Sequence, residues 1–350
     1  MMYYKKLREV GIVGYGSYVP RYRLKAAEIA RAHGAASDQV ERSLLVGEKS
    51  VANWDEDSAT MAYMASARAL SMAGFAPIKI GAVYVGSESH PYAVKPTSTI
   101  VGEALGVGHD YMAADLEFAC KAGTAAIQIV AGQIISGVID YGLAVGTDCA
   151  QARPGDALEY TAASGAAGFI LGRRGLLASL DGFVSYSSDI NDFWRRSGEQ
   201  YPSHAGRFTG EPAYFRHVVA ATERFFKASS THPSDYAYVV FHMPNGKFPR
   251  RAAEKLGFQK RQYGPAMVVS EIGNPYSASA LLGLCQVLDR AAAGERILAT
   301  AYGSGAGADT LAFTTTPLLV EERKRAGSFS AFSPVYLSYG EYRVLHDDIS

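Results

Sequence analysis

An internal repeat constrains the fold of this 350-residue chain more than any other feature of its sequence. In each copy a strand-like run ends in a polar residue, a helix-like run follows, and a second polar residue precedes a long helix rich in small residues. These polar residues are Glu88 and Cys120 in the first copy and His242 and Asn274 in the second, 32 residues apart in both. The matched order and spacing predict two similar halves. The alternative is that two α/β units have the same order and spacing of elements by chance.

Apolar strand-like runs alternate with Ala-rich helix-like runs, which is typical of an α/β fold. The repeat adds a strand directly before Cys120 and another before Asn274. We expect one half over residues 1–175 and the other over 176–350, packed as pseudo-twofold partners around one central site. Strands are expected at 80–89, 141–150, 165–172, 236–244 and 296–313. Helices are expected at 55–74, 98–106, 121–137, 212–229, 249–257 and 277–294.

The composition is that of a globular protein and argues against several function classes. Hydrophobic residues make up 48% of the chain and the formal net charge is zero, so no global field would recruit nucleic acid or an anionic membrane. The three cysteines lie far apart, which argues against a disulfide framework and predicts a reducing compartment. No Cys/His cluster indicates a metal site. Residues 1–16 lack the features of a signal peptide and polar residues interrupt the longest apolar run, 125–146, so we expect a cytoplasmic protein.

Cys120 lies in "FACKAGTAA", between a strand-like run and the helix expected at 121–137. Exposed N–H groups and the partial positive charge of a helix N-terminus stabilise a thiolate, so this cysteine can have a lowered pKa and act as a nucleophile. A packed core cysteine is the alternative, and position alone does not separate the two. Cys149 and Cys285 fall inside apolar periodic segments, where we expect them in the core.

Glu88 and His242 end apolar runs, where a polar side chain is costly unless it has a partner or a task. A raised pKa would suit Glu88 to proton abstraction, and His242 could donate a hydrogen bond to a carbonyl oxygen. The alternatives are a solvated carboxylate and a satisfied core histidine. Asn274 offers an amide that can orient a thioester or His242. His90 lies two residues after Glu88, and the sequence pattern around it indicates a more exposed position, so we expect no catalytic role for it.

Basic residues and glycine-rich turns surround these positions. Lys247 and Arg251 lie at an expected helix start, a natural place for phosphate contact. The connection between the halves, 189–215, is long and rich in Gly, Pro, aromatic and Arg residues, which indicates a function. Its arginines could meet an anionic ligand, although any one of them could equally be a solvated residue. Gly/Ala turns at 161–168 and 302–309 could bring backbone N–H groups close to a ligand.

Cys, His and Asn on a duplicated α/β frame resemble the thiolase superfamily of condensing enzymes, and within it the short, archaeal-type hydroxymethylglutaryl-CoA synthases. The motifs that carry the resemblance are "VGSES", "FACKAGTAA", "YPSHAGRFTGEPAYF", "FHMPNGKFPRRA", "GNPYSASALLGL" and "YGSGAGAD", which run from about residue 9 to residue 315. The resemblance implies a thiolase-like fold of two pseudo-twofold related βαβαβαββ halves in five layers.

The resemblance also implies a reaction and a role for each residue. Acetyl-CoA, acetoacetyl-CoA and water would give 3-hydroxy-3-methylglutaryl-CoA and CoA, a step of the mevalonate pathway to isoprenoids. Cys120 would carry the acetyl group, Glu88 would remove a proton from its methyl, and His242 would hydrogen-bond or protonate the ketone oxygen of the acceptor. Backbone N–H groups of Cys120 and Ser304 would form the oxyanion hole. The implied substrate- and CoA-binding positions are Thr161, Arg207, Thr209, Lys247, Arg251, Asn274 and Ser304.

For cofactors and partners, the resemblance implies CoA thioesters as substrates, no metal or redox cofactor, a homodimer, and a complex with acetoacetyl-CoA thiolase and a small zinc-containing scaffold protein. Two departures from the family pattern limit what carries over. The Gly/Ala turn reads "AASGAAG", and the chain lacks the long C-terminal extension of eukaryotic forms.

Three other functions stay open from the residues. An initiating ketoacyl synthase would use Cys120, His242 and Asn274 without needing Glu88. A catalytically silent subunit would only bind and position partners. A Cys-dependent hydrolase would use water as the acceptor. The glutamate before the cysteine and the "FHMP" context favour the hydroxymethylglutaryl-CoA synthase interpretation.

Overall fold

The computed structural model describes residues 9–305, 307–326 and 333–347, so residues 1–8, on which the signal-peptide prediction partly rests, lie outside the described residues. The strands are β1 (Gly11–Tyr18), β2 (Tyr22–Lys25), β3 (Glu48–Val51), β4 (Ile80–Gly86), β5 (Met112–Leu116), β6 (Tyr141–Cys149), β7 (Ser164–Gly172), β8 (Ala178–Ser187), β9 (Phe193–Trp194), β10 (Ser203–His204), β11 (Tyr238–Phe241), β12 (Arg296–Gly303), β13 (Gly307–Thr315) and β14 (Val335–Tyr336). The helices are α1 (Ala26–Ala32), α2 (Ser37–Leu44), α3 (Ser58–Ala73), α4 (Thr97–Leu105), α5 (Ala122–Ile135), α6 (Phe215–Ser229), α7 (Lys247–Lys255), α8 (Lys260–Tyr263), α9 (Val269–Ile272), α10 (Ser279–Leu288), α11 (Pro317–Ala326) and α12 (Tyr339–Asp347).

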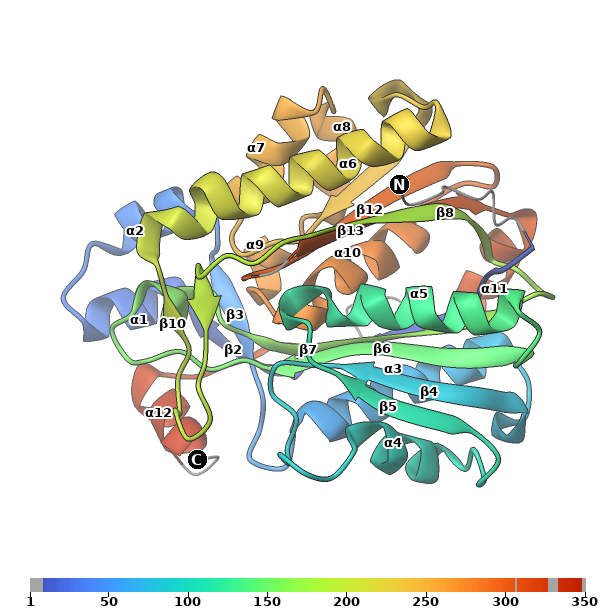
Figure 1. Ribbon diagram of the computed structural model, residues 1–350. Helices are drawn as coiled ribbons and strands as arrows, with labels where there is room; N and C mark the ends of the chain where they lie inside the picture. Colours follow the sequence, from blue (N-terminus) through green and yellow to red (C-terminus); the bar gives the residue numbers. More distant parts are fainter. Residues whose placement is uncertain (1–8, 306, 327–332, 348–350) are drawn as a thin grey trace.

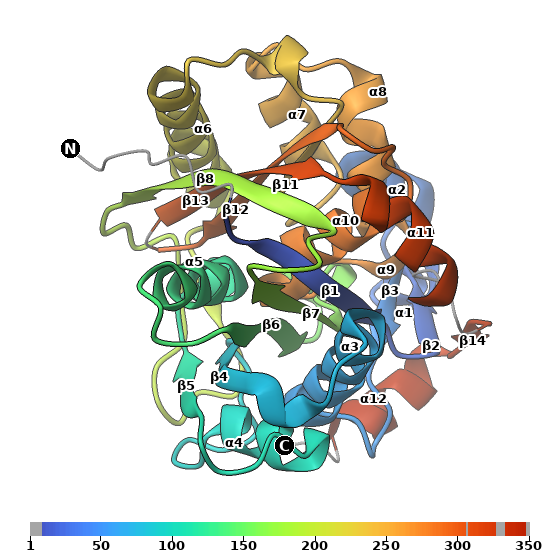
Figure 2. The ribbon, with the colours of Figure 1, turned by 90° about the vertical axis from the view of Figure 1, so that its right-hand side faces the viewer.

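These elements stack in five layers (Figure 1). Helices α6, α7 and α8 cover one outer face, and α3 and α4 cover the other. Between two layers of strands lie α5 and α10, which Figure 2 shows in the middle of the molecule. Both central helices are apolar nearly all round, as helices between two layers of strands must be. The predicted five-layered α/β fold is therefore confirmed.

Strands from the two halves of the chain form one continuous sheet of nine strands, in the order β11-β12-β13-β8-β1-β7-β6-β4-β5. The two parts join where β1 pairs with β8, at Gly11 opposite Ser179 and Ile12 opposite Ala178. The pairing pattern repeats: β4–β6–β7–β1 and β11–β12–β13–β8 each begin with a parallel pair and continue antiparallel. The boundary placed at residues 175/176 falls in the turn between β7 and β8, and the division into two domains stays a prediction.

Apart from the strand expected before Asn274, each expected helix and strand overlaps an observed one, and the run 296–313 contains both β12 and β13. Helix α3 shows why such predictions succeed. Asp57 Oδ1 accepts a hydrogen bond from Thr60 N at 2.8 Å, and Thr60 Oγ1 accepts one from Asp57 N at 2.7 Å, which closes a capping box. The helix ends at Gly74, whose φ of +70° lies in the left-handed region that glycine adopts freely.

The strand expected before Asn274 is wrong. This segment forms the short helix α9, and Asn274 itself makes only an isolated bridge to Ala162. A side chain of β3 and the backbone just before β3, rather than a strand pairing, bond the backbone here. Ser50 Oγ donates to the Ile272 carbonyl at 3.1 Å, and Gly47 N donates to the Ser270 carbonyl at 3.0 Å. With its polar groups satisfied in this way, the segment needs no sheet partner.

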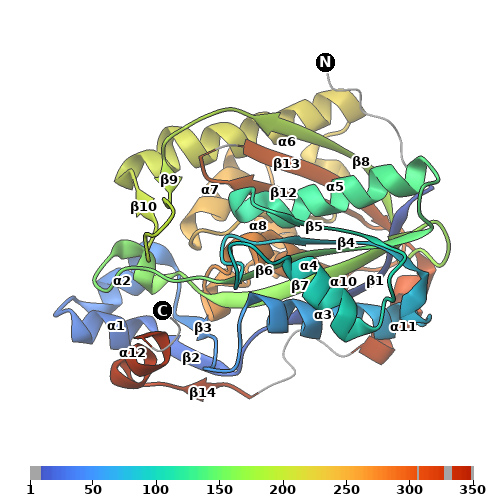
Figure 3. The same cartoon turned by 60° about the horizontal axis from the view of Figure 1, so that its bottom comes forward.

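A second, three-stranded sheet, β14-β2-β3, lies with α1 and α12 at one end of the molecule (Figure 3). Cys149 and Cys285 are buried, as predicted, and each is a free thiol. Along the residues that the structure describes, no helix combines the length and apolar character needed to cross a membrane.

Small residues let the N-terminal end of α5 approach its neighbours closely. A Cβ atom added to Gly123 would lie 2.9 Å from the Cα of Gly146 on β6, 3.2 Å from the Ser277 carbonyl oxygen and 2.6 Å from a methyl of Leu281. The backbones of β6, α5 and the segment before α10 therefore meet at a point where no side chain fits. Because α5 follows Cys120 directly, this contact also fixes the position of the cysteine.

Gly123→Ala should overpack this contact and lower the free energy of unfolding by about 1–3 kcal/mol. Gly132→Ala on the same helix is the matched control, because a Cβ there meets nothing within 4 Å. It should be neutral or stabilise by about 0.5–1 kcal/mol through the better helix propensity of alanine. Urea unfolding of the two variants measures both effects, and equal stabilities would show that the close approach at Gly123 is unimportant.

Candidate active site

Cys120 lies on a 3-10 turn, Ala119–Lys121, that leads from β5 into α5. The preceding Ala119 has a φ of +44°, a left-handed backbone that residues with a Cβ rarely adopt and that often occurs at functional sites. The turn buries the thiol, and Cys120 Sγ donates a hydrogen bond to Glu88 Oε1 at 2.9 Å. The two polar residues of the first copy are thus in direct contact.

Glu88 follows β4, and its carboxylate is enclosed although the residue keeps some exposed surface. Burial raises the pKa of this carboxyl from 4.5 to about 8, and the nearby charge of Asp148 adds to the effect. The hydrogen bond from Cys120 and the charge of Arg195 act in the opposite direction. The raised pKa expected for a proton-abstracting Glu88 is therefore present.

The lowered pKa predicted for Cys120 is wrong. Burial raises the pKa of the thiol well above 9, and the neighbouring Glu88 raises it further. Cys120 does lie at the entrance to a helix, as predicted, but enclosure and a facing carboxylate outweigh the helix N-terminus. The Cys120 thiol is therefore neutral and is hydrogen-bonded to the carboxylate of Glu88.

Asp148, at the end of β6, was missed in the sequence and holds the segment that carries Glu88. Its buried Oδ1 accepts hydrogen bonds from Glu88 N at 2.7 Å, Ser87 Oγ at 2.8 Å and Ser89 Oγ at 2.7 Å. Its Oδ2 accepts one from Ser277 N at 2.7 Å, on the segment that follows Asn274. The signal available in the sequence was a carboxylate at the end of an apolar strand, the same signal that singled out Glu88.

His242 follows β11 and is almost completely buried. Its main chain is fixed by Tyr214 Oη, which donates to the His242 carbonyl at 2.7 Å, and by the His242 N–H, which donates to the Thr300 carbonyl at 2.9 Å. Burial lowers the pKa of the imidazole to about 3, so the ring is neutral. Among the described residues its buried Nδ1 has no hydrogen-bond partner, which leaves that nitrogen for a ligand.

Asn274 lies two residues before Tyr276, whose side chain packs with Cys120. Its backbone N–H donates to the Thr161 carbonyl at 2.6 Å, which brings the two predicted substrate-binding residues together. Its Oδ1 accepts a hydrogen bond from Tyr276 N at 3.0 Å, so the amide nitrogen is the group left to donate. Tyr276 packs in one buried cluster with Cys120, Ala150, Ala152 and Ala162.

Tyr302, which the sequence analysis did not single out, connects His242 with the turn that carries Ser304. Its ring lies 6.4 Å from the His242 ring, and its hydroxyl donates to Asp192 Oδ2 at 3.0 Å. Asp192 is a hydrogen-bond partner of Ser304, and its carbonyl accepts a bond from Thr209 Oγ1 at 3.3 Å. Ser304 and Thr209, predicted from distant parts of the chain, are therefore neighbours.

A buried ion pair next to Cys120 joins the two parts of the chain. Lys121 Nζ lies 3.0 and 3.1 Å from the two carboxylate oxygens of Asp309 on β13. Thr124 Oγ1 and Ser185 Oγ also donate to this carboxylate, at 2.9 and 2.6 Å. The charge of Lys121 therefore has a structural role in this ion pair. No feature of the sequence indicated that Asp309 is its partner.

The predicted basic positions gather on a separate, exposed surface. Lys247 begins α7 and Arg251 lies one turn later, with its guanidinium 3.7 Å from Glu211. Gly210 packs against the ring of Phe248, so the 3-10 turn that carries Arg207 lies beside α7. The side chains of Lys247, Arg251 and Arg207 therefore lie on an exposed surface, here called the exposed rim, and not in the buried site around Cys120.

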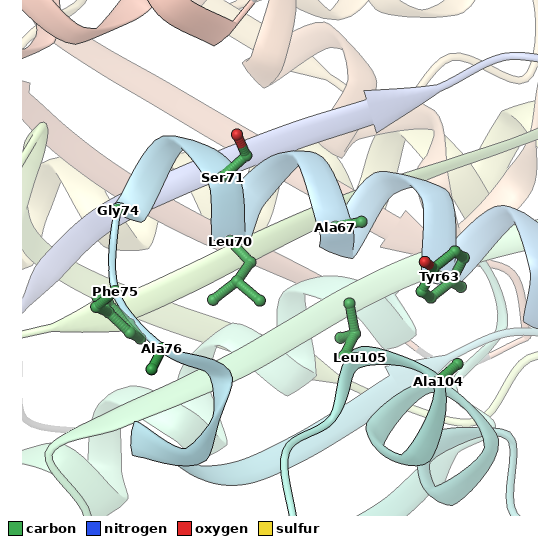
Figure 4. A pocket seen from close by; sticks show the side chains of 9 residues that line it. All are labelled: Tyr63, Ala67, Leu70, Ser71, Gly74, Phe75, Ala76, Ala104 and Leu105. Carbon is green, nitrogen blue, oxygen red and sulfur yellow. The ribbon is translucent and has the colours of Figure 1, made fainter.

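A hollow between α3 and α4 is not part of this centre (Figure 4). Small and apolar side chains line it, among them Leu70, Phe75 and Leu105, and none of the predicted site residues is there. Within the described part of the chain, no group of three or more His, Cys, Asp and Glu side chains could hold a metal ion.

Comparison with known proteins places the chain in a family. The family described as 3-oxoacyl-[acyl-carrier-protein (ACP)] synthase III C terminal matches residues 226–314. The hydroxymethylglutaryl-CoA synthase of Methanopyrus kandleri is 54% identical over 335 residues, which cover 95% of this chain and 96% of that protein. The hydroxymethylglutaryl-CoA synthase of Archaeoglobus fulgidus is 56% identical over 307 residues, which cover 88% of this chain and 89% of that protein.

Solved structures show the same fold. MvaS in complex with 3-hydroxy-3-methylglutaryl coenzyme A superposes with a TM-score of 0.88 at 24% identity, covering 99% of this chain and 92% of that one. The 3-oxoacyl-(acyl carrier protein) synthase III of Pseudomonas aeruginosa superposes with a TM-score of 0.79 at 20% identity, covering 88% of this chain and 98% of that one. With more than half of its residues identical to those of relatives that match most of its length, the chain belongs to the hydroxymethylglutaryl-CoA synthase family, which confirms the predicted thiolase-like fold and the predicted class of acyltransferase.

Proposed function

We propose that this protein condenses acetyl-CoA with acetoacetyl-CoA and water to give 3-hydroxy-3-methylglutaryl-CoA and CoA, with Cys120 as nucleophile, Glu88 as base and His242 as hydrogen-bond donor. The observation that carries the proposal is the 2.9 Å hydrogen bond from the Cys120 thiol to the Glu88 carboxylate. It joins a nucleophile to a base whose pKa suits proton transfer near neutral pH.

In the first step the Cys120 sulfur attacks the thioester carbonyl of acetyl-CoA. The thiol proton passes to the ionised Glu88 across the existing hydrogen bond, the bond from the carbonyl carbon to CoA breaks, and the proton leaves with the CoA thiolate. Backbone N–H groups of Cys120 and Ser304 are proposed to hold the developing oxyanion. The step leaves an acetyl thioester on Cys120 and returns Glu88 to its ionised form.

In the second step Glu88 takes a proton from the acetyl methyl group, and the resulting carbanion attacks the ketone carbon of acetoacetyl-CoA. The ketone oxygen becomes an alkoxide, which His242 stabilises by hydrogen bonding. The proton that Glu88 took from the methyl group then passes to this oxygen, which returns Glu88 to its ionised form. A neutral imidazole suits this role, because it can donate without placing a full charge in the buried site. Asn274 and Thr161, which touch through their main chains, are proposed to hold the acceptor thioester.

Hydrolysis completes the cycle. Water attacks the Cys120 thioester, the sulfur leaves and regains its proton, and the product departs with a free carboxylate. Arg207, Thr209, Lys247 and Arg251 are proposed to hold the phosphates of CoA, because their segments lie side by side at the exposed rim. The CoA thioesters enter as substrates, and the chemistry calls on no redox or metal cofactor.

The setting of the reaction is also a proposal: a cytoplasmic homodimer in the mevalonate pathway, in a complex with acetoacetyl-CoA thiolase and a small zinc-containing scaffold protein. Strand β5 supports the dimer, because it ends the nine-stranded order and its first two residues are exposed. An unpaired sheet edge is a ready site for pairing with another chain.

Wild-type protein incubated briefly with acetyl-CoA should gain one acetyl group, and Cys120→Ala should gain none, because the sulfur is the proposed acceptor. Intact-protein mass spectrometry measures both. Adding acetoacetyl-CoA should remove the adduct from the wild type as 3-hydroxy-3-methylglutaryl-CoA appears. An adduct that water clears equally fast without acetoacetyl-CoA would indicate a hydrolase, and no adduct would favour a catalytically silent subunit.

The kcat/KM for condensation should rise with pH up to about 8 and then level off, because Glu88 is protonated below its raised pKa and acts as a base only when ionised. Glu88→Gln should abolish this dependence and lower the rate by about a hundredfold or more. Steady-state rates between pH 6 and about 10 measure both. A Glu88→Gln variant with nearly normal condensation would favour the initiating ketoacyl synthase, which has no need of this base.

A further inference from the structure

A short ribbon between the two halves reaches the catalytic base. It consists of residues 193–204, in which β9 and β10 pair in antiparallel fashion through Trp194 opposite Ser203 and Phe193 opposite His204. Figure 3 shows β9 and β10 side by side, between α6 and the end of the molecule that carries α1 and α12. This β9–β10 ribbon belongs to the long connection 189–215, for which the sequence predicted a function.

The base of the ribbon is firmly anchored. Asp192, directly before β9, is fully buried. Its carboxylate accepts hydrogen bonds from Tyr302 Oη at 3.0 Å and from the backbone of Gly305, and its carbonyl accepts one from Ala205 N at 2.8 Å. The two residues that flank the ribbon, Asp192 and Ala205, are thereby bonded to each other and, through Asp192, to the turn after β12.

From this anchor the ribbon touches two parts of the catalytic centre. The ring of Phe193 lies 5.9 Å from the ring of Tyr276, which packs beside Cys120. The guanidinium of Arg195 donates from Nη2 to the Glu88 carbonyl at 3.1 Å and from Nη1 to the Glu199 carbonyl at 3.4 Å. Arg195 is exposed, so it is held at Glu88 by these hydrogen bonds rather than by burial.

Glu88 is therefore held at both of its main-chain polar groups. Asp148, from inside the protein, accepts the hydrogen bond of its N–H, and Arg195, from the ribbon, donates to its carbonyl. We propose that Arg195 is a positioning residue for Glu88, and that the β9–β10 ribbon supplies it so that the carboxylate is held at the Cys120 sulfur through both proton transfers. The inference rests on the proposed role of Glu88 as the base.

The charges around Glu88 add a second effect of the same contact. The carboxylate is faced by Asp148 from β6, Cys120 from the turn before α5, Tyr276 from the turn before α10, and Arg195 from the ribbon. Of these four groups only Arg195 carries a positive charge, and it lowers the pKa of Glu88 against the opposing action of burial and Asp148. Removal of this charge shifts the ionisation of Glu88 to higher pH.

The test compares Arg195→Gln with Arg196→Gln in the full-length protein. Arg196 lies next in the ribbon and is equally charged and exposed, and its backbone N–H donates to Glu199 Oε2 while its carbonyl accepts from Glu199 N, both at 3.1 Å. Arg195→Gln should lower kcat for condensation by about tenfold to a hundredfold, with the KM for acetyl-CoA close to that of the wild type. It should also move the acid limb of the pH profile to higher pH. Arg196→Gln should stay within about twofold of the wild type, because an exposed charge without a contact to the site contributes little.

A third variant separates charge from geometry. Arg195→Lys keeps a positive charge but loses the planar fork that reaches two carbonyl groups at once, so the acid limb should return toward the wild-type position while kcat stays reduced. The inference is overturned if Arg195→Gln and Arg196→Gln behave alike, or if Arg195→Gln lowers kcat without moving the acid limb. A wild-type protein without synthase activity would overturn the proposed function itself, and the inference with it.

Discussion

The hydrogen bonds to the buried carboxylate of Asp148 are the interactions on which the candidate active site depends. A charged group without water must be matched by hydrogen-bond donors, and here four converge on it, three from residues 87–89 and one from Ser277. The first three come from the segment after β4, and the fourth comes from the segment that follows Asn274. The hydrogen bonds that satisfy this one buried carboxylate therefore fix the main chain of Glu88, and place the segment that follows Asn274 beside it.

In the proposed reaction the two parts of the chain divide the chemistry. The first part would supply the nucleophile and base, Cys120 and Glu88, which are in hydrogen-bond contact. The second part would supply the neutral donors, His242 and Asn274, whose main chains are fixed by bonds to neighbouring strands and loops. The ion pair of Lys121 and Asp309 crosses between the parts immediately behind the sulfur. Removing one partner of a buried pair leaves an uncompensated charge, so this contact opposes any shift of one half against the other.

The electrostatics of the centre differ from those of a simple thiolate site. The pKa of Cys120 is raised rather than lowered, because its thiol faces a carboxylate in an enclosed space. The pKa of Glu88 is raised for the same reason. Two groups that both disfavour the charged form can share one proton, which suits the proposed cycle, in which Glu88 would accept a proton first from sulfur and then from carbon. Neighbours brought from distant parts of the chain set these pKa values, so local position could not predict them.

The sequence by itself determined the alternation of helices and strands, the repeat, and the four polar residues at its matched positions, because periodicity and strand-end polarity are local properties of the chain. Only the tertiary structure decided which groups meet. It replaced the strand before Asn274 with α9, because residues 47–50 satisfy the backbone there. It also brought Asp148, Tyr302 and Arg195 to the centre through contacts that span 60 to 110 residues of sequence. Such contacts follow from the packing of whole layers, and no local pattern encodes them.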